Sequence, residues 1–414
     1  TDEVRQFLLW YAPHQLPDGK VPCCVDARGA DPVPEHDSHG QLIYAIMEYY
    51  RYTRDVGFLR EMWPHVVKAV DYIEFLRQQR LTEQYRTDPT AIAYWGLMPE
   101  SISHEGYASH PRHSYWDDFF TLRGLKDAAT IAVILGEDKQ AARFATLRDV
   151  FRKDLYASIR ATIEKHHIDF IPGAVELGDF DATSTTVAVD PGGELGRLPQ
   201  PALNRTFERY FDLFKHRHDG QEQWEAYTPY ELRVVGTLIR LGQRDRALEA
   251  LSFFLEGQRP AAWNHWAEVV WRDPKTPRFI GDMPHTWVGS DFIRSVRNLF
   301  VYEREADQAL VIGAGIPADW ATSPEGITVK RLPTWHGTLN YRMQMSGPDT
   351  LRVQLTGDVV VPPGRIILHS PLPRPLQSVK VNNQPLQTFV TAAATLDQFP
   401  AEIEFQYGSE VLAK

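Results

Sequence analysis

The sequence predicts a mainly α-helical fold, a closed double ring of paired helices, followed by a C-terminal antiparallel β-sandwich. Up to about residue 305, apolar residues recur about every 3.6 positions over long segments, which indicates amphipathic helices. From about residue 308 to residue 414, short runs alternate apolar and polar residues between Gly, Pro and Asn turns, which is typical of a β-sandwich. We therefore expect two domains, residues 1–305 and residues 306–414.

Ten helices are expected, and the links between them alternate in length. The expected helices cover about residues 1–11, 37–54, 58–80, 114–135, 138–165, 183–190, 200–216, 229–242, 244–257 and 287–303. Short links alternate with long loops at about 12–36, 81–113, 166–182, 217–228 and 258–286. Because the long loops follow every second helix, they must collect at one end, as they would in a double ring. Loops longer than about 12–15 residues are usually functional, so this end is the expected functional face.

The expected inner helices start with residues that favour helix N-termini. Their first residues are Asp37, Ser114, Thr183 or Ser184, Thr228 and Thr286. Asp, Ser and Thr side chains accept hydrogen bonds from the first free backbone N–H groups of a helix. The partial positive charge of the first helical turn also suits nearby carboxylates.

The expected strands of the sandwich are short and separated by turn residues. They include the runs GITVKRL, TLNYRMQM, TLRVQLTG, RIILHS and SVKVNNQPLQTFV. The run VKVNNQPL predicts a hairpin, because Asn-Asn tolerates the positive φ angles of a tight two-residue turn.

Composition excludes several classes of function. The 414 residues carry a formal net charge of −10, which leaves no basic surface for nucleic acid. No run of about 18 apolar residues that could span a membrane is present. The neighbours Cys23 and Cys24 are the only cysteines, too few for a disulfide framework or a cysteine-rich metal site. No metal-binding or nucleotide-binding motif is found, so we expect no metal and no cofactor.

Three segments, taken together with the trailing sandwich, resemble the six-hairpin glycosidases. They are SYWDDFFTLRGLKDAA, DFDATSTTVAVDPGG and MPHTWVGSDFIRSVRNL. These (α/α)6-barrel enzymes include trehalases, rhamnosidases, glucoamylases and related disaccharide phosphorylases. The resemblance covers nearly the whole chain and implies twelve helices, so the first hairpin is expected in an N-terminal portion upstream of Thr1.

This resemblance implies an exo-acting, inverting glycoside hydrolase that cleaves a terminal sugar from an oligosaccharide or polysaccharide. The alternatives are a phosphorylase on the same barrel and a non-catalytic carbohydrate-binding protein. We expect a periplasmic or secreted location rather than a cytoplasmic one, with any targeting signal upstream of the sequence.

The family places its general acid between the fifth and sixth helices, which here means loop 81–113 and the helix start after it. The candidates are Glu100, Glu105, Asp117 and Asp118. Glu105, next to a glycine and among aromatic residues, resembles the acid of the maltose-phosphorylase and glucoamylase branches. Asp117 follows an aromatic residue at a helix start, as in the trehalase and glucosidase branches. The choice between them stays open.

The family places its general base in the last long loop, where Glu268 is the favoured candidate. Glu268 lies in the sequence among Trp263, Trp266 and Trp271, which combine an apolar environment with rings on which a sugar can stack. Asp282 is either an alternative base or a hydroxyl-binding residue. An inverting pair of carboxyl groups is about 6.5–9.5 Å apart, which leaves room for a water molecule.

Sugar recognition needs aromatic faces for C–H surfaces and charged or amide groups for hydroxyls, and the long loops and helix starts supply both. The expected substrate-binding residues are Asp37, His39, Glu100, Trp116, Asp181, Trp224, Glu225, Trp263, Trp266, Asp282, His285 and Trp287.

Overall fold

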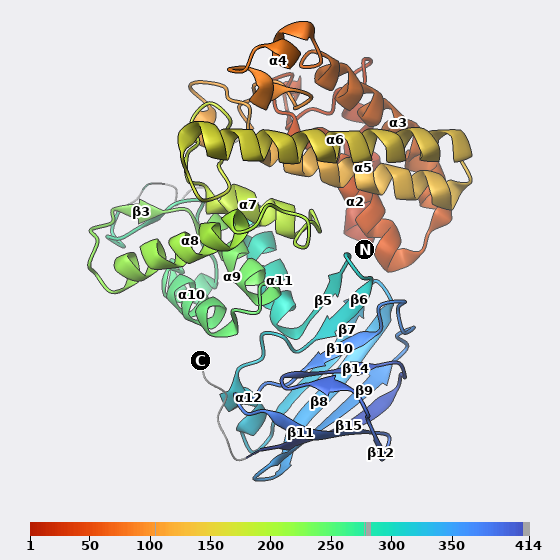
Figure 1. Cartoon of the computed structure of the whole chain (residues 1–414), viewed down its shortest axis with the longest axis vertical. Coiled ribbons are helices and arrows are strands. Elements are labelled where there is room, and N and C mark those ends of the chain that lie inside the picture. The colour runs from red at the N-terminus through yellow and green to blue at the C-terminus, as the bar shows by residue number, and fades with distance from the viewer. Residues whose placement is uncertain (104, 277, 279–282, 409–414) are drawn as a thin grey trace. The chain divides into compact units, whose positions relative to one another are not determined.

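The computed structural model describes residues 1–103, 105–276, 278 and 283–408 (Figure 1). The chain divides into two compact units, Thr1–Tyr210 and Phe211–Lys414, and the division falls inside helix α8 (Ala202–His218). The first unit is helical, and the second combines helices with two larger β-sheets. The expected domain boundary near residue 305 stays a prediction.

The ten predicted helices are present close to their predicted bounds. They are α1 (Asp2–Tyr11), α2 (Asp37–Thr53), α3 (Val56–Gln78), α5 (Tyr115–Leu135), α6 (Asp138–His166), α7 (Ala182–Val189), α8, α9 (Leu232–Arg240), α10 (Arg244–Glu256) and α11 (Thr286–Phe300). Two further helices, α4 (Glu83–Thr87) and α12 (Ala318–Thr322), were not predicted. At five residues each, they are too short to produce a recognisable apolar period.

The last predicted helix was drawn too long at its C-terminal end. It ends at Phe300, and the next residues form strand β5 (Val301–Arg304). Val301 and Tyr302 are of the β-branched and aromatic types that favour strands, and β5 pairs with β6 (Ala309–Ile312).

Ser114 is the N-cap residue of α5, as predicted, but the N-cap residues of the other inner helices differ from prediction. The N-cap of α2 is His36 in place of Asp37, and that of α9 is Glu231 in place of Thr228.

The N-cap of α7 is Asp181, whose carboxylate accepts a 3.1 Å hydrogen bond from the backbone N–H of Ser184. The N-cap of α11 is His285, whose Nδ1 accepts a 3.4 Å bond from the N–H of Val288. In both helices, a residue shortly before the predicted N-cap carries the side-chain acceptor. It lies three residues before the backbone N–H group to which it bonds.

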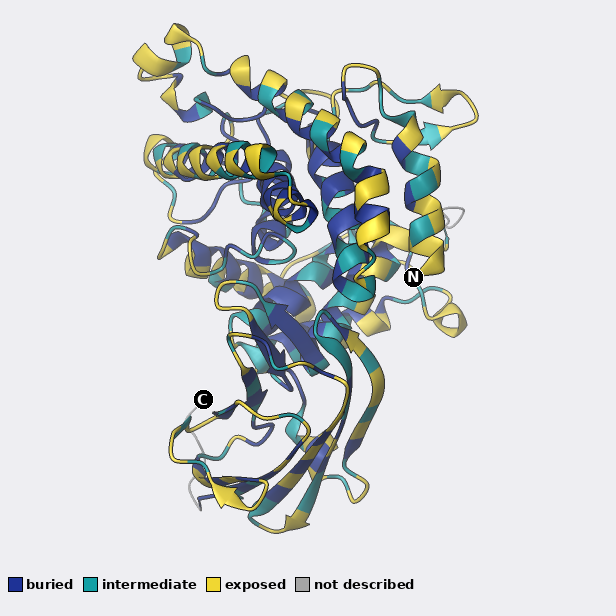
Figure 2. Ribbon diagram, turned by 90° about the vertical axis from the view of Figure 1, so that its right-hand side faces the viewer, coloured by how far each residue is buried: buried dark blue, intermediate teal, exposed yellow. Residues whose placement is uncertain are grey.

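Within the first unit, the helices form an inner and an outer layer. Helix α5 is buried on nearly all sides, where it packs against α2, α3, α6 and α7. Helix α6 buries one stripe, including Phe144, Phe151 and Ile159, and exposes the opposite side (Figure 2). Arg143 of α6 also forms 2.6 Å ion pairs with Asp71 and Glu74 of α3. The layering agrees with the predicted pairing of inner and outer helices.

Helices α2 and α5 approach each other at two glycines. A Cβ atom added to Gly40 would lie 2.0 Å from the carbonyl oxygen of Phe120, and one added to Gly124 would lie 2.6 Å from the Cα of Gly40. Only glycine permits this direct backbone contact. The first turn of α2 is therefore held against the second and third turns of α5.

The second unit contains a β-sandwich of two sheets. The six-stranded sheet has the order β12-β11-β15-β9-β8-β7, and the five-stranded sheet has the order β13-β14-β10-β6-β5. The remaining bounds are β7 (Ile327–Thr334), β8 (Gly337–Gly347), β9 (Thr350–Gly357), β10 (Ile366–His369), β11 (Leu376–Val381), β12 (Gln384–Pro385), β13 (Phe389–Val390), β14 (Ala393–Leu396) and β15 (Ala401–Tyr407). Neighbouring strands in these sheets pair antiparallel, except that β10 and β6 are parallel.

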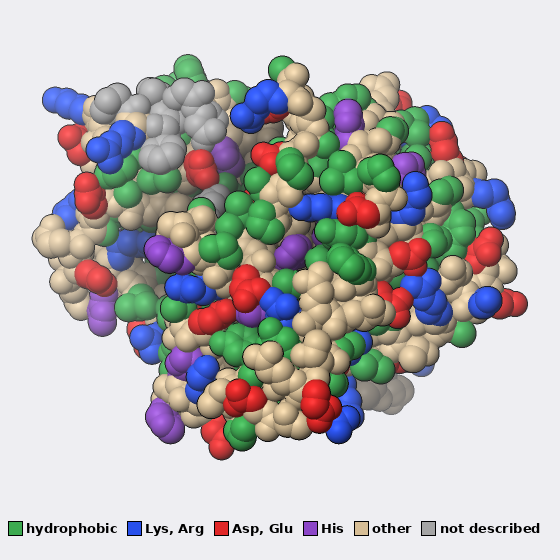
Figure 3. Space-filling view, turned by 90° about the horizontal axis from the view of Figure 1, so that it is seen from above, with side chains coloured by type: hydrophobic (Ala, Val, Ile, Leu, Met, Phe, Trp, Pro, Cys, Tyr) green, Lys and Arg blue, Asp and Glu red, His purple; other side chains and the backbone are tan. Residues whose placement is uncertain are grey.

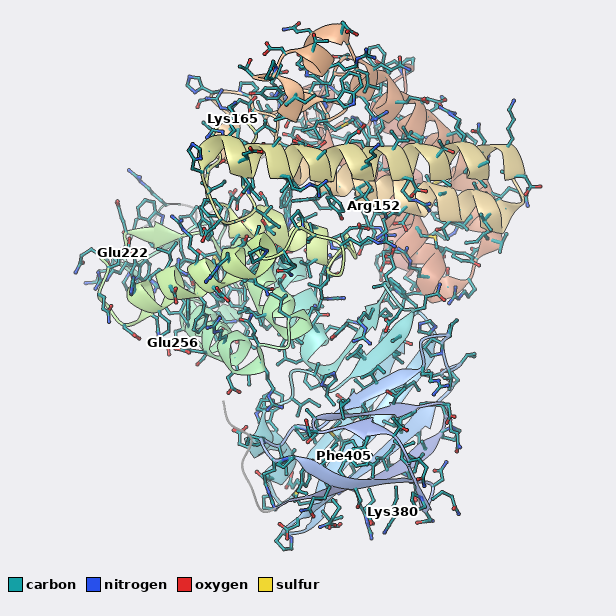
Figure 4. All side chains as sticks on the ribbon, in the orientation of Figure 1. Arg152, Lys165, Glu222, Glu256, Lys380 and Phe405 are labelled. Atoms are coloured by element: carbon teal, nitrogen blue, oxygen red, sulfur yellow. The ribbon has the colours of Figure 1, made fainter. Side chains whose placement is uncertain are left out.

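The two sheets enclose a core of alternating residues. Tyr341 of β8 and Val353 of β9 are buried in it. Phe405 of β15 is also buried there, whereas Lys380 of β11 is exposed (Figure 4). The predicted Asn-Asn hairpin is confirmed, because Asn382 and Asn383 have φ angles of 51° and 65° between the paired strands β11 and β12.

None of the described helices combines the length and the apolar character needed to cross a lipid bilayer. Charged side chains of both signs lie intermixed with apolar ones on the face shown in Figure 3.

Candidate active site

The close approach of α2 and α5 brings Asp37 and Trp116 into contact. The Asp37 carboxylate accepts a 2.8 Å hydrogen bond from the indole nitrogen of Trp116 and a 2.7 Å bond from the amide of Gln41. Both Asp37 and Trp116 are buried. Burial raises the pKa of Asp37, and the Trp116 bond opposes this increase. These two predicted binding residues thus form one hydrogen-bonded pair at the helix starts.

Asp117 and Asp118 in the first turn of α5 are completely buried, with 0% of each residue exposed. The Ser101 hydroxyl donates to Asp117 Oδ2, and the Met98 N–H donates to Asp118 Oδ1 at 3.0 Å. Among the described residues, the other oxygen of each carboxyl group has no hydrogen-bond partner. Burial raises the pKa of Asp118 to about 8, and burial followed by the charge of Asp37 raises the pKa of Asp117 well above its ordinary value. Burial therefore favours the protonated form of both carboxyl groups.

Glu100 has the opposite environment. Its carboxylate is about half exposed and forms an ion pair with Arg80. Burial would raise the pKa of Glu100, but the nearby His113 and Arg80 hold it below its ordinary value. His113 in turn accepts a 2.8 Å bond from Arg80 and lies 2.6 Å from a carboxylate oxygen of Glu176. Glu100 is accordingly ionised at neutral pH.

His39 and Asp181 both bond to backbone that leads into the inner helices. The backbone N–H of Val21 donates to His39 Nδ1 at 3.2 Å, and burial lowers the pKa of His39 well below its ordinary value. Asp181 caps α7 and also accepts a 2.6 Å bond from the Thr183 hydroxyl. Their contribution to sugar binding stays a prediction.

The backbone of Glu105 belongs to a short 3-10 helix, Glu105–Tyr107, whose Tyr107 hydroxyl donates to Asp179 at 2.8 Å. The Glu105 side chain lies outside the described part of the structure, as does the whole of Asp282.

In the second unit, Glu268 belongs to a cluster of aromatic and charged residues. The Tyr230 hydroxyl donates to Glu268 Oε1 at 3.4 Å and lies 3.5 Å from His285 Nε2. The rings of Tyr230 and Trp287 are 5.3 Å apart, and the guanidinium of Arg233 lies 5.0 Å and 5.4 Å from their respective centres. We call these five residues the Glu268 cluster. It offers a partly exposed carboxylate beside the exposed indole of Trp287.

Asp291 holds Arg233 in the Glu268 cluster through a 2.8 Å ion pair. The sequence prediction missed Tyr230 and Arg233. Both residues lie within the first two turns after the predicted helix start at Thr228, which is at the expected functional face. This position in the sequence could have marked them as candidates.

The other predicted tryptophans have different environments. Trp266 is 1% exposed and donates its indole N–H to the Phe254 carbonyl at 2.7 Å, so it packs in the core and offers no open face to a sugar. Trp263 is 60% exposed. The ring of Trp224 lies 5.7 Å from that of Tyr227 and 5.9 Å from the guanidinium of Arg272.

Glu225 is exposed, and its carbonyl oxygen accepts a 2.8 Å bond from the Arg272 N–H. A hollow of about 370 Å³ lies in the same unit and includes Ala267, Val269 and Trp271 in its wall. The sequence neighbours of Glu268 thus border a space large enough for a small ligand.

One group of possible metal ligands occurs in the described ranges. The ligand atoms of Cys23, Cys24 and Asp31 all lie within 4.8 Å of one another. The sequence had not singled out this combination.

Comparison with known proteins finds solved structures with a similar fold. No model of a protein family matches the chain, and no curated protein matches it. Among solved structures, an α-L-rhamnosidase from Dictyoglumus thermophilum superposes with a TM-score of 0.59 at 14% identity, covering 97% of this chain and 43% of that one. A GH78 family rhamnosidase of Bacillus sp. GL1 gives a TM-score of 0.51 at 15% identity, covering 89% of this chain and 36% of that one.

An α-L-rhamnosidase from Aspergillus terreus also gives a TM-score of 0.51, at 14% identity, with 95% of this chain and 43% of that one covered. The chain thus shares the fold of these structures over the aligned residues, an α-helical part followed by a β-sandwich, as the resemblance implied. It spans less than half the length of these structures.

Proposed function

We propose that the chain is the helical core and C-terminal sandwich of an exo-acting, inverting glycoside hydrolase that removes a terminal sugar from an oligosaccharide or polysaccharide. The observation that carries the proposal is the Glu268 cluster. A partly exposed carboxylate, hydrogen-bonded by Tyr230 and next to an exposed indole, combines a candidate base with a surface for sugar stacking. The glycosidase fold supports the same function.

Glu268 is the proposed general base. A base in an inverting reaction must be ionised and must contact the attacking water. The Tyr230 hydroxyl donates a 3.4 Å hydrogen bond to the Glu268 carboxylate and so helps to orient it. Tyr230 and the neighbouring ring of Trp287 place this carboxylate beside the proposed sugar.

Glu105 is the proposed general acid, because the other three candidates have environments that do not suit this role. Burial favours the protonated form of Asp117 and Asp118, but with no exposed surface they cannot touch a glycosidic oxygen. Glu100 is exposed, but its pairing with Arg80 keeps it ionised. Glu105 is the remaining candidate in this loop, next to a glycine in a short 3-10 helix. We assign Asp117 and Asp118 to shaping the start of α5.

The test compares a natural oligosaccharide with an activated aryl glycoside. p-Nitrophenolate leaves with little protonation, so Glu105→Gln should lose most activity on the oligosaccharide and keep much more on the p-nitrophenyl glycoside. Glu268→Gln should lose activity on both, because each reaction needs the attacking water. Glu222→Gln, in an exposed loop, is the matched control and should behave like the wild type.

α-L-Rhamnosides are the first substrates to try, since the similar structures are α-L-rhamnosidases. NMR of the first product should show an inverted anomer. A retained anomer contradicts the proposed mechanism, and turnover that depends on phosphate would indicate a phosphorylase instead. Hydrolysis of no glycan at all would contradict the enzymatic function.

A further inference from the structure

The two cysteines form an unusual pair at the surface of the first unit. Adjacent residues in an extended strand point to opposite faces, which keeps their side chains apart. Cys23 and Cys24 instead precede strand β1 (Val25–Asp26) in an irregular segment, and their Sγ atoms are only 2.6 Å apart. This separation is well inside the roughly 3.5–4.0 Å of an ordinary contact between nonbonded atoms.

The surroundings of the two thiols differ. Cys24 is exposed, whereas Cys23 is partly buried. The Cys24 thiol can therefore meet a reagent from solution, and the Cys23 thiol is placed to react with whatever Cys24 has bound.

We propose that Cys23 and Cys24 are a modification site that exchanges with low-molecular-weight disulfides and closes to a vicinal disulfide. In the first step, the Cys24 thiolate attacks a disulfide RSSR, forms a Cys24–SR bond and releases RS⁻. In the second step, the Cys23 thiolate attacks Cys24 Sγ, forms the Cys23–Cys24 bond and releases a second RS⁻. The protein loses two hydrogen atoms, and the reagent is reduced to two thiols after protonation.

The ring that forms is strained and therefore reversible. The Cα atoms of neighbouring residues are about 3.8 Å apart across a trans peptide bond, whereas bridged cysteines usually keep theirs about 4.4–6.8 Å apart. Strain raises the reduction potential, so a moderate excess of a monothiol should reopen the bond.

The pair is linked to the start of helix α2. The Cys24 carbonyl accepts a 3.0 Å bond from the Asp31 N–H, and Lys20 donates to the Val33 carbonyl at 2.8 Å. Val21 donates to His39, which lies in the first turn of α2. Closing the ring should therefore change hydrogen exchange in residues 20–36, a segment that leads to Asp37.

The test uses the full chain treated with oxidised glutathione and analysed by intact mass. Because the chain has no other cysteines, each change in thiol content arises from this pair. Wild type should lose the mass of two hydrogen atoms, and the tryptic peptide 21–28, bounded by Lys20 and Arg28, should carry the change. Reduced glutathione should reverse it.

Single variants separate the two steps. Cys23→Ser should trap one glutathione on Cys24, whereas Cys24→Ser should remain largely unmodified under the same conditions. A stable mixed disulfide in wild type, a disulfide between two chains, or two unreacted thiols would each overturn the proposal. Full protection of both thiols by added zinc ions would assign the pair, with Asp31, to metal binding instead.

Discussion

The buried carboxyl group of Asp118 should make the stability of the protein depend on pH, and Asp118→Asn tests this. In the folded protein its pKa is about 8, whereas in the unfolded chain it is about 3.9. The unfolded state thus releases this proton at a lower pH than the folded state. The contribution of the protonated Asp118 carboxyl group to the free energy of unfolding is fully present below about pH 4. It falls as the pH rises and is lost by about pH 8.

The magnitude follows from the bound proton. Between the two pKa values, each pH unit lowers the free energy of unfolding by up to about 1.4 kcal/mol for this one group. Asparagine is neutral and keeps an oxygen that can accept the Met98 N–H bond. From pH 5 to pH 7, wild type should therefore lose up to about 2.7 kcal/mol relative to Asp118→Asn. Relaxation of the buried site is expected to reduce this value.

The assay is urea unfolding of both proteins at pH 5, 6 and 7, followed by circular dichroism. The control is Asp138→Asn, which removes an exposed carboxylate from the first turn of α6 and should leave the pH dependence unchanged. Equal pH dependence in wild type and Asp118→Asn would refute a protonated Asp118. So would a variant that loses stability relative to wild type as the pH rises.

Three further substitutions test individual parts of the fold by urea unfolding. Phe405→Ala empties a fully buried position between the two sheets and should cost about 3–5 kcal/mol, whereas Lys380→Ala on the exposed face should cost little; a small cost for Phe405→Ala would contradict the described sandwich core. Asp181→Ala removes the cap of α7 and should cost about 1 kcal/mol, while Asp181→Asn should retain most of the stability; equal losses would argue against capping. Asn383→Ala places a Cβ-bearing residue without a polar side chain at a φ of 65° and should cost roughly 1–2 kcal/mol, which Asn383→Gly should not; the reverse order would contradict the turn geometry.

The helices and the Asn-Asn hairpin could be predicted because their signals are local. Apolar periodicity in the sequence predicted the long helices. Two adjacent asparagines predicted the turn, because asparagine tolerates the positive φ angles that the structure shows there. The prediction was wrong at the end of α11, where pairing between β5 and β6 favours a strand over one more helical turn. That pairing depends on residues that follow the helix.

The environments of the candidate site residues depend on contacts that the local pattern does not contain. The sequence indicated that Asp117 and Asp118 are carboxylates at a helix start. It could not show that they are buried or that Ser101 and the Met98 backbone bond to them. Tyr230 contacts Glu268 from 38 positions away, so no spacing rule could connect the two. The functional face that the long loops indicated stays a prediction, and tertiary packing determined which side chains are exposed.

The contact between Gly40 and Gly124 limits how this protein can be re-engineered. Libraries that randomise the loops around α2 and α5 can change the neighbours of Asp37 and Trp116 while the backbone contact stays intact. A single methyl group at either glycine would force the two backbones apart and displace both side chains together. In a deep mutational scan, these two positions should tolerate no other amino acid, even though neither carries a group that could touch a substrate.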